Sequence, residues 1–420
     1  SCFLSIYNQS FCVRSKIPPA GGIFLCRAIL PASFHRRFPA YPDTPPIEQQ
    51  PMQPSTLIQE LEQLIAIPSH EDCTPILHYL EKRLDFLRWE RQEVGKQVGG
   101  RPQYNLIHLD PDRPFIVNTH VDTVPPLGMA DPFRPRRTED RIYGRGAVDT
   151  KGLLAALTIA LEACHRTHGQ VPVSVAFTVD EENTSAAGSA TLARLLGPDH
   201  CVLVLEPSNG HICTRQAGAL EFEVRSYGTP RHAALFHRGP HPIRTLMAYL
   251  QAAENALQRP LNVLSFQGGW DHYATPPEAR ALVEVIIPAD QRWEPAEEVL
   301  QQLARTMFRD EVEYRRVDAE NPLDFGHHAG VALLEEAYTE ALDRHPQYDT
   351  MPSWTDAANF ARAGASCVIF GFGDLARAHG PEEYITVAEL VDTARVLYRL
   401  FTILIHSSRR IPERRNPMRR

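Results

Sequence analysis

Short apolar runs alternate with longer stretches of helical period along most of this chain. Four runs have the length and composition of buried strands: residues 115–117, 173–179, 201–205 and 366–370. Three stretches place apolar side chains at the helical period: residues 150–165, 329–344 and 386–406. This alternation predicts an α/β domain built on a mostly parallel sheet with helices on both faces. Ligands of such sheets gather at the carboxyl ends of the strands.

The pattern changes between residues 217 and 321. The elements expected there are strands at 219–226, 281–287 and 311–317 and helices at 243–257 and 295–308. Strands and helices in this order predict a small α+β sandwich inserted into the larger domain. The larger domain is then discontinuous and consists of residues 52–216 and 322–408.

The first 51 residues follow neither a strand period nor a helix period. They are compatible with a transit-type leader, a disordered extension, or residues translated upstream of the true start. Met52 is the first methionine, and an amphipathic helix follows it with Ser55 as the expected N-cap. We therefore expect residues 1–51 to be a disordered or artefactual extension. Residues 409–420, with six arginines against Glu413, are expected to form a basic tail.

Composition and charge narrow the classes of function. The 420 residues are 43% hydrophobic and 22% charged, which is typical of a globular protein. The net charge is -8, and because both ends are basic, residues 43–408 alone carry about -18. Such an acidic body repels phosphate backbones, which argues against nucleic-acid binding. No apolar run reaches the roughly 18 residues of a membrane helix, and the eight cysteines form no C-x-x-C pair, so we expect a cytoplasmic protein without a membrane partner.

Acidic residues and histidines follow the predicted strands or stand in a glycine-rich turn. The residues concerned are His120, Asp122, Asp149, Asp180, Glu181, Glu182, Glu206 and His379. Taken singly, each is more typical of surface charge, and Asp149 also suits the N-cap of the helix that follows it. Carboxylates packed this closely need a cation or solvent to compensate them. A mixture of carboxylates and imidazoles favours Zn²⁺, Co²⁺ or Mn²⁺ over Ca²⁺.

Five motifs carry a family resemblance. They are T-H-V-D-T-V-P at 119–125, G-R-G-A-V-D-T-K-G at 144–152, D-E-E at 180–182, L-E-P at 205–207 and A-H-G-P-E-E-Y at 378–384. In this order they resemble the M20 metallopeptidase/deacylase family, and in general look the branch of acetylornithine deacetylases and succinyl-diaminopimelate desuccinylases. The resemblance covers nearly all of residues 52–406. It implies that the insertion is the lid and dimerisation domain of that family.

The resemblance also implies a dinuclear metal centre. Asp149 would bridge two divalent ions, with Zn²⁺ expected first and Co²⁺ or Mn²⁺ as alternatives. His120 and Glu206 would complete the ligands of one ion. Glu182 and His379 would complete those of the other.

Three further residues receive roles from the same resemblance. Asp122 would orient His120 and raise its basicity. Glu181 would act as general base, taking a proton from a metal-activated water and handing it to the leaving nitrogen. His232, in the segment G-T-P-R-H-A-A, resembles the lid histidine that reaches the partner's active site in dimeric members and helps hold the oxyanion. This implies a homodimer formed through the lid domain, although a histidine in a surface loop is the alternative, because His237 and His241 lie close by.

The expected reaction is the removal of an acyl group from a small N-acyl amino acid substrate by a dinuclear-metal hydrolase. A di- or tripeptidase or a carboxypeptidase with the same metal site stays open, because the motifs define the metal centre and not the acyl group. A non-catalytic metal-binding interaction module is a third alternative, which the presence of Glu181 disfavours. The segments W-T-D-A-A at 354–358 and F-G-F-G at 370–373 resemble the family's substrate-binding turn and glycine loop, with Phe372 where Pro is frequent. Residues 268–276 depart from its Asn-x-Ile-Pro lid segment, which predicts a different substrate pocket.

Overall fold

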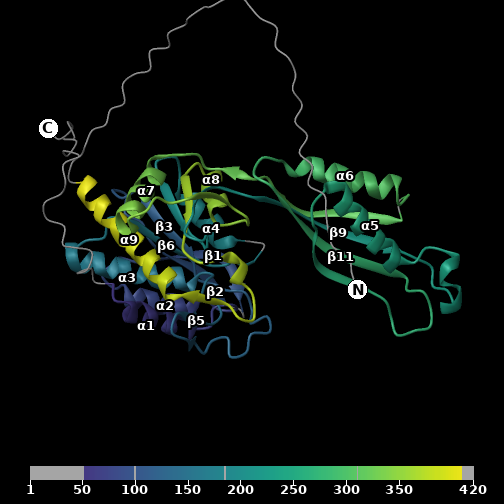
Figure 1. Cartoon of the computed structure of the whole chain (residues 1–420), viewed down its shortest axis with the longest axis horizontal. Coiled ribbons are helices and arrows are strands. Elements are labelled where there is room, and N and C mark those ends of the chain that lie inside the picture. Colours follow the sequence, from purple (N-terminus) through teal and green to yellow (C-terminus); the bar gives the residue numbers. More distant parts are fainter. Residues whose placement is uncertain (1–51, 99–100, 184–185, 310, 409–420) are drawn as a thin grey trace, which may run out of the picture. The chain divides into compact units, whose positions relative to one another are not determined.

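The computed structural model describes residues 52–98, 101–183, 186–309 and 311–408. Its larger sheet has nine strands, in the order β1-β2-β6-β3-β7-β15-β8-β13 with β14 paired to β8. Figure 1 labels β1, β2, β3 and β6 of this sheet. The expectations for residues 1–51 and 409–420 lie outside the described residues. Among the described helices, none is both long enough and apolar enough to cross a membrane.

Neighbouring parallel strands form the middle of this sheet. They are β6 (Ser174–Thr178), β3 (Phe115–His120), β7 (Cys201–Leu205) and β15 (Ser366–Phe370). β3 pairs in parallel with β6 and β7, and β7 pairs in parallel with β15. Helices lie over both sides of these strands, so their side chains are buried on both faces and read as continuous apolar runs. The predicted α/β fold is confirmed.

Outer strands extend the sheet on both sides, most of them antiparallel to their neighbours. They are β1 (Glu90–Val98), β2 (Arg101–His108), β8 (Ile212–Gln216), β13 (Leu323–Asp324) and β14 (Tyr348–Met351). The hydrophobic pattern did not predict these strands. β2 begins with two exposed residues and β14 is exposed over its first half, so neither presents a continuous apolar run.

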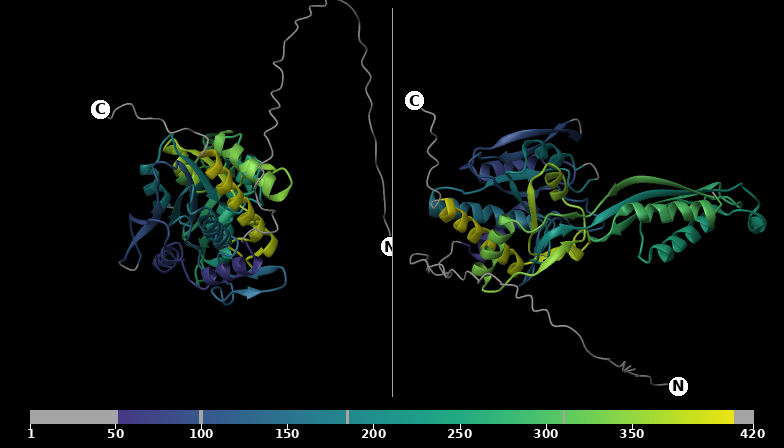
Figure 2. Two further views of the ribbon diagram at one scale, coloured as in Figure 1. Left: turned by 90° about the vertical axis from the view of Figure 1, so that its left-hand side faces the viewer. Right: turned by 90° about the horizontal axis from the view of Figure 1, so that it is seen from above.

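Helices cover both faces of the sheet, as predicted. The helices on one face are α1 (Pro54–Ile65), α2 (Thr74–Arg83), α3 (Lys151–His168), α7 (Ala329–Leu342) and α9 (Val387–Ser408) (Figures 1 and 2). They share an apolar cluster with the side chains of Val117, Leu205 and Phe370. α4 (Ala187–Leu192) and α8 (Ala357–Arg362) pack on the other face against Ile116 and Val204. Successive residues of each strand therefore place their side chains in two apolar cores on opposite sides of the sheet.

The first helix begins differently from the prediction. α1 starts at Pro54, and Gln53 is its N-cap without a side-chain hydrogen bond. Ser55 lies inside the helix, so its predicted role as N-cap is wrong. Proline suits the first helical position because its missing N–H would have no intrahelical partner there.

A small sheet joins two segments that later prove to carry the site. β5 (Arg141–Tyr143) pairs with β16 (Tyr384–Thr386) on one side and with β4 (Arg136–Arg137) on the other. β5 leads directly into the glycine-rich turn at 144–149, and β16 directly follows residues 379–383. Short 3-10 turns lie at Ala193–Leu195, Ala233–Arg238 and Leu375–Arg377.

Residues 218–320 form a second sheet with a core of its own. Its antiparallel strands run in the order β10 (Asn262–Gly268), β11 (Glu278–Ile287), β9 (Gly218–Tyr227) and β12 (Val312–Glu320). α5 (Pro242–Leu257) and α6 (Trp293–Thr306) cover one face, where Leu220, Phe222 and Leu300 are buried. The sequence did not predict β10, because all its residues are exposed and a bulge breaks its alternation. We propose that this unit is the separate domain predicted for residues 217–321.

The chain enters and leaves this unit through paired strands. Glu320 at the end of β12 pairs with Ala219 at the start of β9. Leu323 of β13 then pairs with Gln216 of β8 in the larger sheet. The two crossings therefore run side by side as antiparallel neighbours.

Close packing behind the turn after β6 can be tested at Gly188 in α4. A Cβ at Gly188 would lie 2.1 Å from the carbonyl oxygen of Val179, and the carbonyl of Gly188 accepts a hydrogen bond from Asn105 at 2.9 Å. Gly188→Ala should therefore lower the free energy of unfolding by about 1–3 kcal/mol, measured in urea. Gly197→Ala is the matched control, because a Cβ there meets nothing within 4 Å. Wild-type stability of Gly188→Ala would contradict this packing.

Candidate active site

The carboxyl ends of the parallel strands bring the predicted site residues to one edge of the sheet. His120 is the last residue of β3, and Glu206 directly follows β7. Glu181 and Glu182 lie in the turn after β6. His379 belongs to the loop after β15 and adopts a left-handed backbone conformation with a φ of 62°. Side chains far apart in the sequence thus meet because their strands are neighbours.

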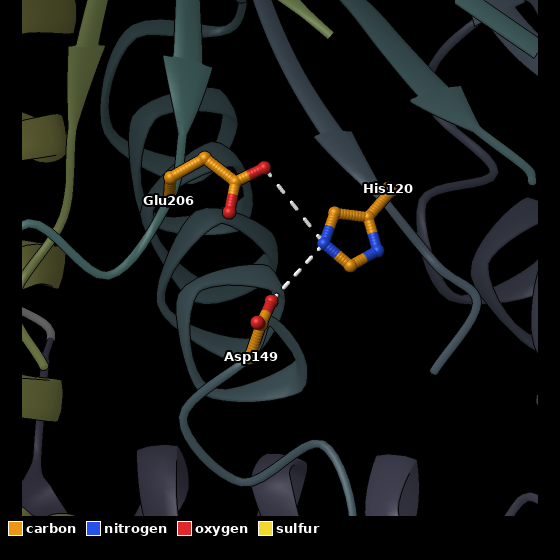
Figure 3. Close-up of side chains that lie close together, drawn as sticks. All are labelled: His120, Asp149 and Glu206. Atoms are coloured by element: carbon orange, nitrogen blue, oxygen red, sulfur yellow. Dashed lines mark hydrogen bonds and ion pairs between the residues drawn. The ribbon is translucent and has the colours of Figure 1, made fainter. Parts of the chain in front are cut away.

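His120, Asp149 and Glu206 form the first of two groups that could hold a metal ion. The Nε2 atom of His120 lies 3.2 Å from Oδ1 of Asp149 and 3.8 Å from Oε1 of Glu206. Figure 3 shows the three side chains pointing toward one another. All three are buried, so their charges are poorly screened by solvent.

Asp149, Glu182 and His379 form the second group. The Nε2 atom of His379 lies 3.0 Å from Oε2 of Glu182 and 3.5 Å from Oδ2 of Asp149. Asp149 thus offers one carboxylate oxygen to each group and stands between them. The side chain of His379 is 47% exposed and that of His120 is 1% exposed, so the second group is the more open to solvent.

A glycine-rich turn places Asp149 directly before α3. Gly146 has a φ of 84°, and a Cβ there would lie 2.8 Å from Thr123 and 2.9 Å from Lys151, so the turn requires glycine. The peptide bond between Asp149 and Thr150 is cis. Thr150 is the N-cap residue of α3. The alternative interpretation of Asp149 as a helix cap is therefore wrong.

Asp122 belongs to neither group but contacts one residue of each. The Nδ1 atom of His120 lies 3.1 Å from the backbone oxygen of Asp122 and 3.6 Å from its carboxylate Oδ1. The other carboxylate oxygen accepts a hydrogen bond from the amide of Glu182 at 3.0 Å. With Nδ1 as the donor, the Nε2 atom of His120 keeps its lone pair free for a cation. This geometry fits the orienting role that the resemblance implies for Asp122.

The buried carboxylates oppose one another's ionisation. Burial raises the pKa of Glu206 well above its ordinary value, and the charge of Asp149 acts in the same direction. Burial also raises the pKa of Glu181 well above its ordinary value. Burial opposes ionisation of Asp149 as well, but hydrogen bonds with His120 and His379 outweigh it and lower its pKa. The site therefore concentrates negative charge that only nearby positive charge stabilises.

The neighbouring carboxylates raise the pKa of both histidines. Hydrogen bonds with Asp149 and Glu182 raise the pKa of His379 to about 10. Burial of His120 opposes its protonation, yet hydrogen bonds with Asp122 and Asp149 raise its pKa well above the ordinary value. Positive charge is thus favoured at both places where an imidazole meets the carboxylates.

The donor atoms of both groups fit divalent cations. In each group one imidazole nitrogen and two carboxylate oxygens lie within 4.8 Å of one another. The Oε1 atom of Glu206 is buried without a hydrogen-bond partner among the described residues, which costs free energy unless a cation or water satisfies it. Nitrogen and oxygen donors in this proportion suit Zn²⁺, Co²⁺ or Mn²⁺. Bound cations would also offset the repulsion among the carboxylates.

A cavity of about 640 Å³ adjoins the two groups. Its lining contains Glu181 and ligand candidates from both groups, together with Trp354 and Arg362. Residues of the second sheet, among them Glu221 and Glu284, complete the lining. Among the described residues that line the cavity, Arg362 is the only lysine or arginine, and it forms an ion pair with Glu320.

The two segments expected to bind substrate have different surroundings. Trp354 lines the cavity, whereas Asp356 is buried and accepts a hydrogen bond from the hydroxyl of Thr178 at 2.7 Å. Burial raises the pKa of Asp356 to about 6. The family resemblance implied a substrate-binding role for the segment 354–358 as a whole, but the contact of Asp356 with β6 could not be predicted, because it depends on the fold. Phe372 is also buried, and its ring stacks on Tyr338 with 5.9 Å between centroids.

His232 lies in an exposed turn of the second sheet's unit. It is exposed at the start of the 3-10 turn Ala233–Arg238, where its side chain accepts a hydrogen bond from the amide of Ala234 at 3.2 Å. It also forms an isolated β-bridge with Ala274. His232 does not belong to either metal group, and it is not among the described residues that line the cavity.

The sequence that forms this site matches a known protein family. The sequence model of peptidase family M20/M25/M40 matches residues 116–402, which is more than half of the chain and includes both metal groups. The chain belongs to this family. As an M20 protein it is a metal-dependent hydrolase that acts on amides.

Several proteins resemble this M20 chain over most of its length. N-acetyl-L-citrulline deacetylase of Xanthomonas campestris is 29% identical over 298 residues, which cover 66% of this chain and 78% of that protein. Acetylornithine deacetylase of Myxococcus xanthus is 29% identical over 366 residues, covering 81% of this chain and 95% of that protein. The solved structure of human carnosine dipeptidase 1 matches with a TM-score of 0.71 at 14% identity, covering 86% of this chain and 98% of that one. That likeness supports the fold.

The shared position of Asp149 generates a prediction about metal content. Asp149→Asn should lose both ions, because this residue belongs to both groups, whereas Glu206→Gln should lose mainly one. Glu181→Gln is the control and should keep both, because Glu181 belongs to neither group. Metal content after dialysis, measured by plasma mass spectrometry, checks this. Equal loss from Asp149→Asn and Glu206→Gln would contradict a shared carboxylate.

Proposed function

We propose that this M20 protein is a dinuclear-metal deacylase that hydrolyses the amide bond of a small N-acyl amino acid. The observation that carries the proposal is a pair of metal groups sharing Asp149, with Glu181 lining the adjoining cavity and belonging to neither group. The names of the two relatives described above support a deacylase. Other relatives, 24–26% identical, are named probable carboxypeptidases, so a peptidase stays the second candidate. The proposal places the chain in the branch of acetylornithine deacetylases and succinyl-diaminopimelate desuccinylases.

Each part of the site has a proposed task. The proposed ligands are Asp149 between the ions, His120 and Glu206 on one side, and Glu182 and His379 on the other. When bound, the two cations polarise the amide carbonyl and lower the pKa of a water molecule. Asp122 keeps His120 in the orientation and tautomer that present Nε2 to the site.

Glu181 is the proposed general base. It lines the cavity, and burial raises its pKa well above that of a solvated glutamate. A carboxylate with a raised pKa holds a proton long enough to transfer it. Glu181 would take the proton of the attacking water and deliver it to the leaving nitrogen, so that the product departs as an amine.

The wall of the cavity contributed by the second sheet favours a substrate with a positive side chain. Glu284 and Asp318 both stand directly opposite Glu221 on neighbouring strands. All three line the cavity. Burial raises the pKa of Glu221, and the charges of Glu284 and Asp318 act in the same direction. An ammonium group held there would relieve the repulsion across the strands, as the side chain of ornithine would and the uncharged side chain of citrulline would not.

The same wall could hold the free α-ammonium of a dipeptide, so the test must separate these substrates. We would assay metal-stripped protein with and without added Zn²⁺ or Co²⁺ on N-acetylornithine, N-acetylcitrulline, N-succinyl-diaminopimelate and dipeptides. Metal-dependent release of an amine from an N-acyl amino acid supports the proposal. Activity on dipeptides alone would replace the deacylase with a peptidase. Bound metal without any turnover would favour a non-catalytic module.

The acidic wall leads to a prediction about selectivity. The double substitution Glu221→Gln and Glu284→Gln should lower the preference for N-acetylornithine over N-acetylcitrulline by about ten-fold or more in kcat/KM, because a charge-assisted contact is lost. Glu223→Gln is the matched control: Glu223 lies on the same strand face but pairs with Arg225 at 2.7 Å and with Arg315 at 3.3 Å. An unchanged preference in the double variant would contradict this wall as the cation site.

We also propose a homodimer that forms through the second sheet. β10 is an edge strand of this sheet, and its side chains Val263, Leu264 and Phe266 are exposed. An exposed apolar edge strand is a natural surface for pairing with a copy of itself. His232 would then supply a donor to the active site of the partner, which agrees with its exposure and with its absence from the described residues that line the cavity of its own chain.

Mixing inactive chains tests whether His232 acts across the dimer. His232→Ala and Glu181→Gln should each be nearly inactive alone. Random dimers of the two variants should regain about one quarter of wild-type activity, because each mixed dimer assembles one complete site. Activity is measured after unfolding and refolding the mixture, with each variant refolded alone as control. Recovery no greater than the sum of the two controls would place His232 in its own site or outside catalysis.

The metal and the compartment are further parts of the proposal. We propose Zn²⁺, because a nitrogen donor joins carboxylate oxygens in each group. We propose a reducing cytoplasmic location, which agrees with free cysteines at the described positions 73, 164, 201, 213 and 367.

A further inference from the structure

A buried ion pair lies behind the two metal groups. Arg145 and Glu383 are 0% and 1% exposed, and Nη1 of Arg145 lies 2.6 Å from Oε2 of Glu383. Arg145 precedes Asp149 by four residues, and Glu383 follows His379 by four residues. The pair therefore joins the loop of one ligand candidate to the loop of another, 238 positions apart.

The second oxygen of Glu383 binds the backbone that carries Asp149. Its Oε1 atom accepts hydrogen bonds from the amides of Val148 at 3.0 Å and Asp149 at 3.3 Å. The backbone oxygen of Glu383 accepts another from the amide of Gly144 at 3.2 Å. Glu383 thus holds the glycine-rich turn at its beginning and at its end, and the orientation of the Asp149 side chain depends on that backbone.

Arg145 also forms a hydrogen bond with a third loop. Its Nη2 atom donates to the backbone oxygen of Pro126 at 2.8 Å, in the segment that follows His120, and lies 3.4 Å from the backbone oxygen of Gly380. The guanidinium therefore spans the segments after His120, before Asp149 and after His379. It also keeps the charge of Glu383 compensated in a place that solvent does not reach.

Stability alone does not explain this pair. Removing two charges from water is costly, and packed apolar side chains of similar size are often at least as stabilising. Neither side chain is among the described residues that line the cavity, so neither contacts substrate there. What the pair provides, and what an apolar pair would not, is an acceptor for the amides of Val148 and Asp149.

We propose that Glu383, held by Arg145, is a positioning residue for Asp149: it fixes the carboxylate that both metal groups share and couples it to the loop that carries His379. The proposal rests on the proposed dinuclear site. One consequence is that loss of the acceptor at position 383 weakens the binding of both ions together, although Glu383 belongs to neither group. Contacts of this kind around metal ligands typically change metal affinity by about 10–100-fold.

Two charge-neutral double variants separate positioning from simple charge pairing. Arg145→Gln with Glu383→Gln keeps an acceptor oxygen for the two amides. Arg145→Met with Glu383→Leu fills the space but removes the acceptor. Zn²⁺ affinity would be measured by competition with a chromophoric chelator, and the geometry of the site by the visible absorption of bound Co²⁺. We expect the Gln pair to stay within about three-fold of wild type and the Met/Leu pair to bind both ions about 10–100-fold more weakly, with an altered Co²⁺ spectrum.

Two further variants complete the design. Glu382→Gln is the matched control, because Glu382 is the neighbouring residue and its ion pair with Arg136 at 2.8 Å is exposed. Glu383→Asp keeps the charge while its shorter side chain withdraws from the amides, so it tests the same contact if the Met/Leu pair does not fold. Circular dichroism of the metal-free proteins establishes which variants fold.

The outcomes distinguish the positioning role from the dinuclear site itself. Weaker binding of both ions by Met/Leu or by Glu383→Asp, with Glu382→Gln unchanged, supports positioning. Wild-type affinity in a folded Met/Leu pair or in Glu383→Asp would overturn it. Equal weakening of the Gln and Met/Leu pairs would also overturn it, because charge and not the acceptor would then matter. A wild-type protein that binds no metal would instead overturn the proposed function.

Discussion

Repulsion among buried carboxylates around Asp149 is the constraint on which the rest of this structure depends. Asp149 lies near both histidines, Glu206 near His120 and Glu182 near His379, and burial raises the pKa of both glutamates. A protein keeps such a cluster only if positive charge and rigid surroundings compensate it. The parallel strands supply the rigidity, since β3, β6 and β7 end at one edge of a sheet with packed cores on both sides.

Two different sets of residues surround the cluster. On one side, Glu383 and Arg145 organise backbone segments without lining the cavity. On the other side, the cavity brings the cluster next to side chains of the second sheet, such as Glu221. In the proposed function, substrate selection and metal geometry would therefore depend on different residues. Changes in one set could then accumulate without disturbing the other, which agrees with relatives that are named for different substrates.

Much of this could be predicted from the sequence, because the central strands are buried on both faces and the motifs follow them directly. His120 and Glu206 could be placed at one edge from strand ends alone. The outer strands were missed because partly exposed strands such as β2 have no continuous apolar run. The contact between Arg145 and Glu383 was missed for another reason. Both residues stand in recognised motifs, but a pairing across 238 positions is visible only after the chain has folded.

The paired crossings between the two sheets have a consequence for how such a chain could arise and diverge. Ala219 and Glu320 are partners in one sheet, and Gln216 and Leu323 are partners in the other, so the insertion leaves the larger sheet almost where it enters. A segment with adjacent ends can be exchanged, shortened or lost with little strain on the host fold. The inserted unit could therefore be replaced by a different one, in evolution or by design, while the larger sheet and the residues at its carboxyl edge keep their arrangement.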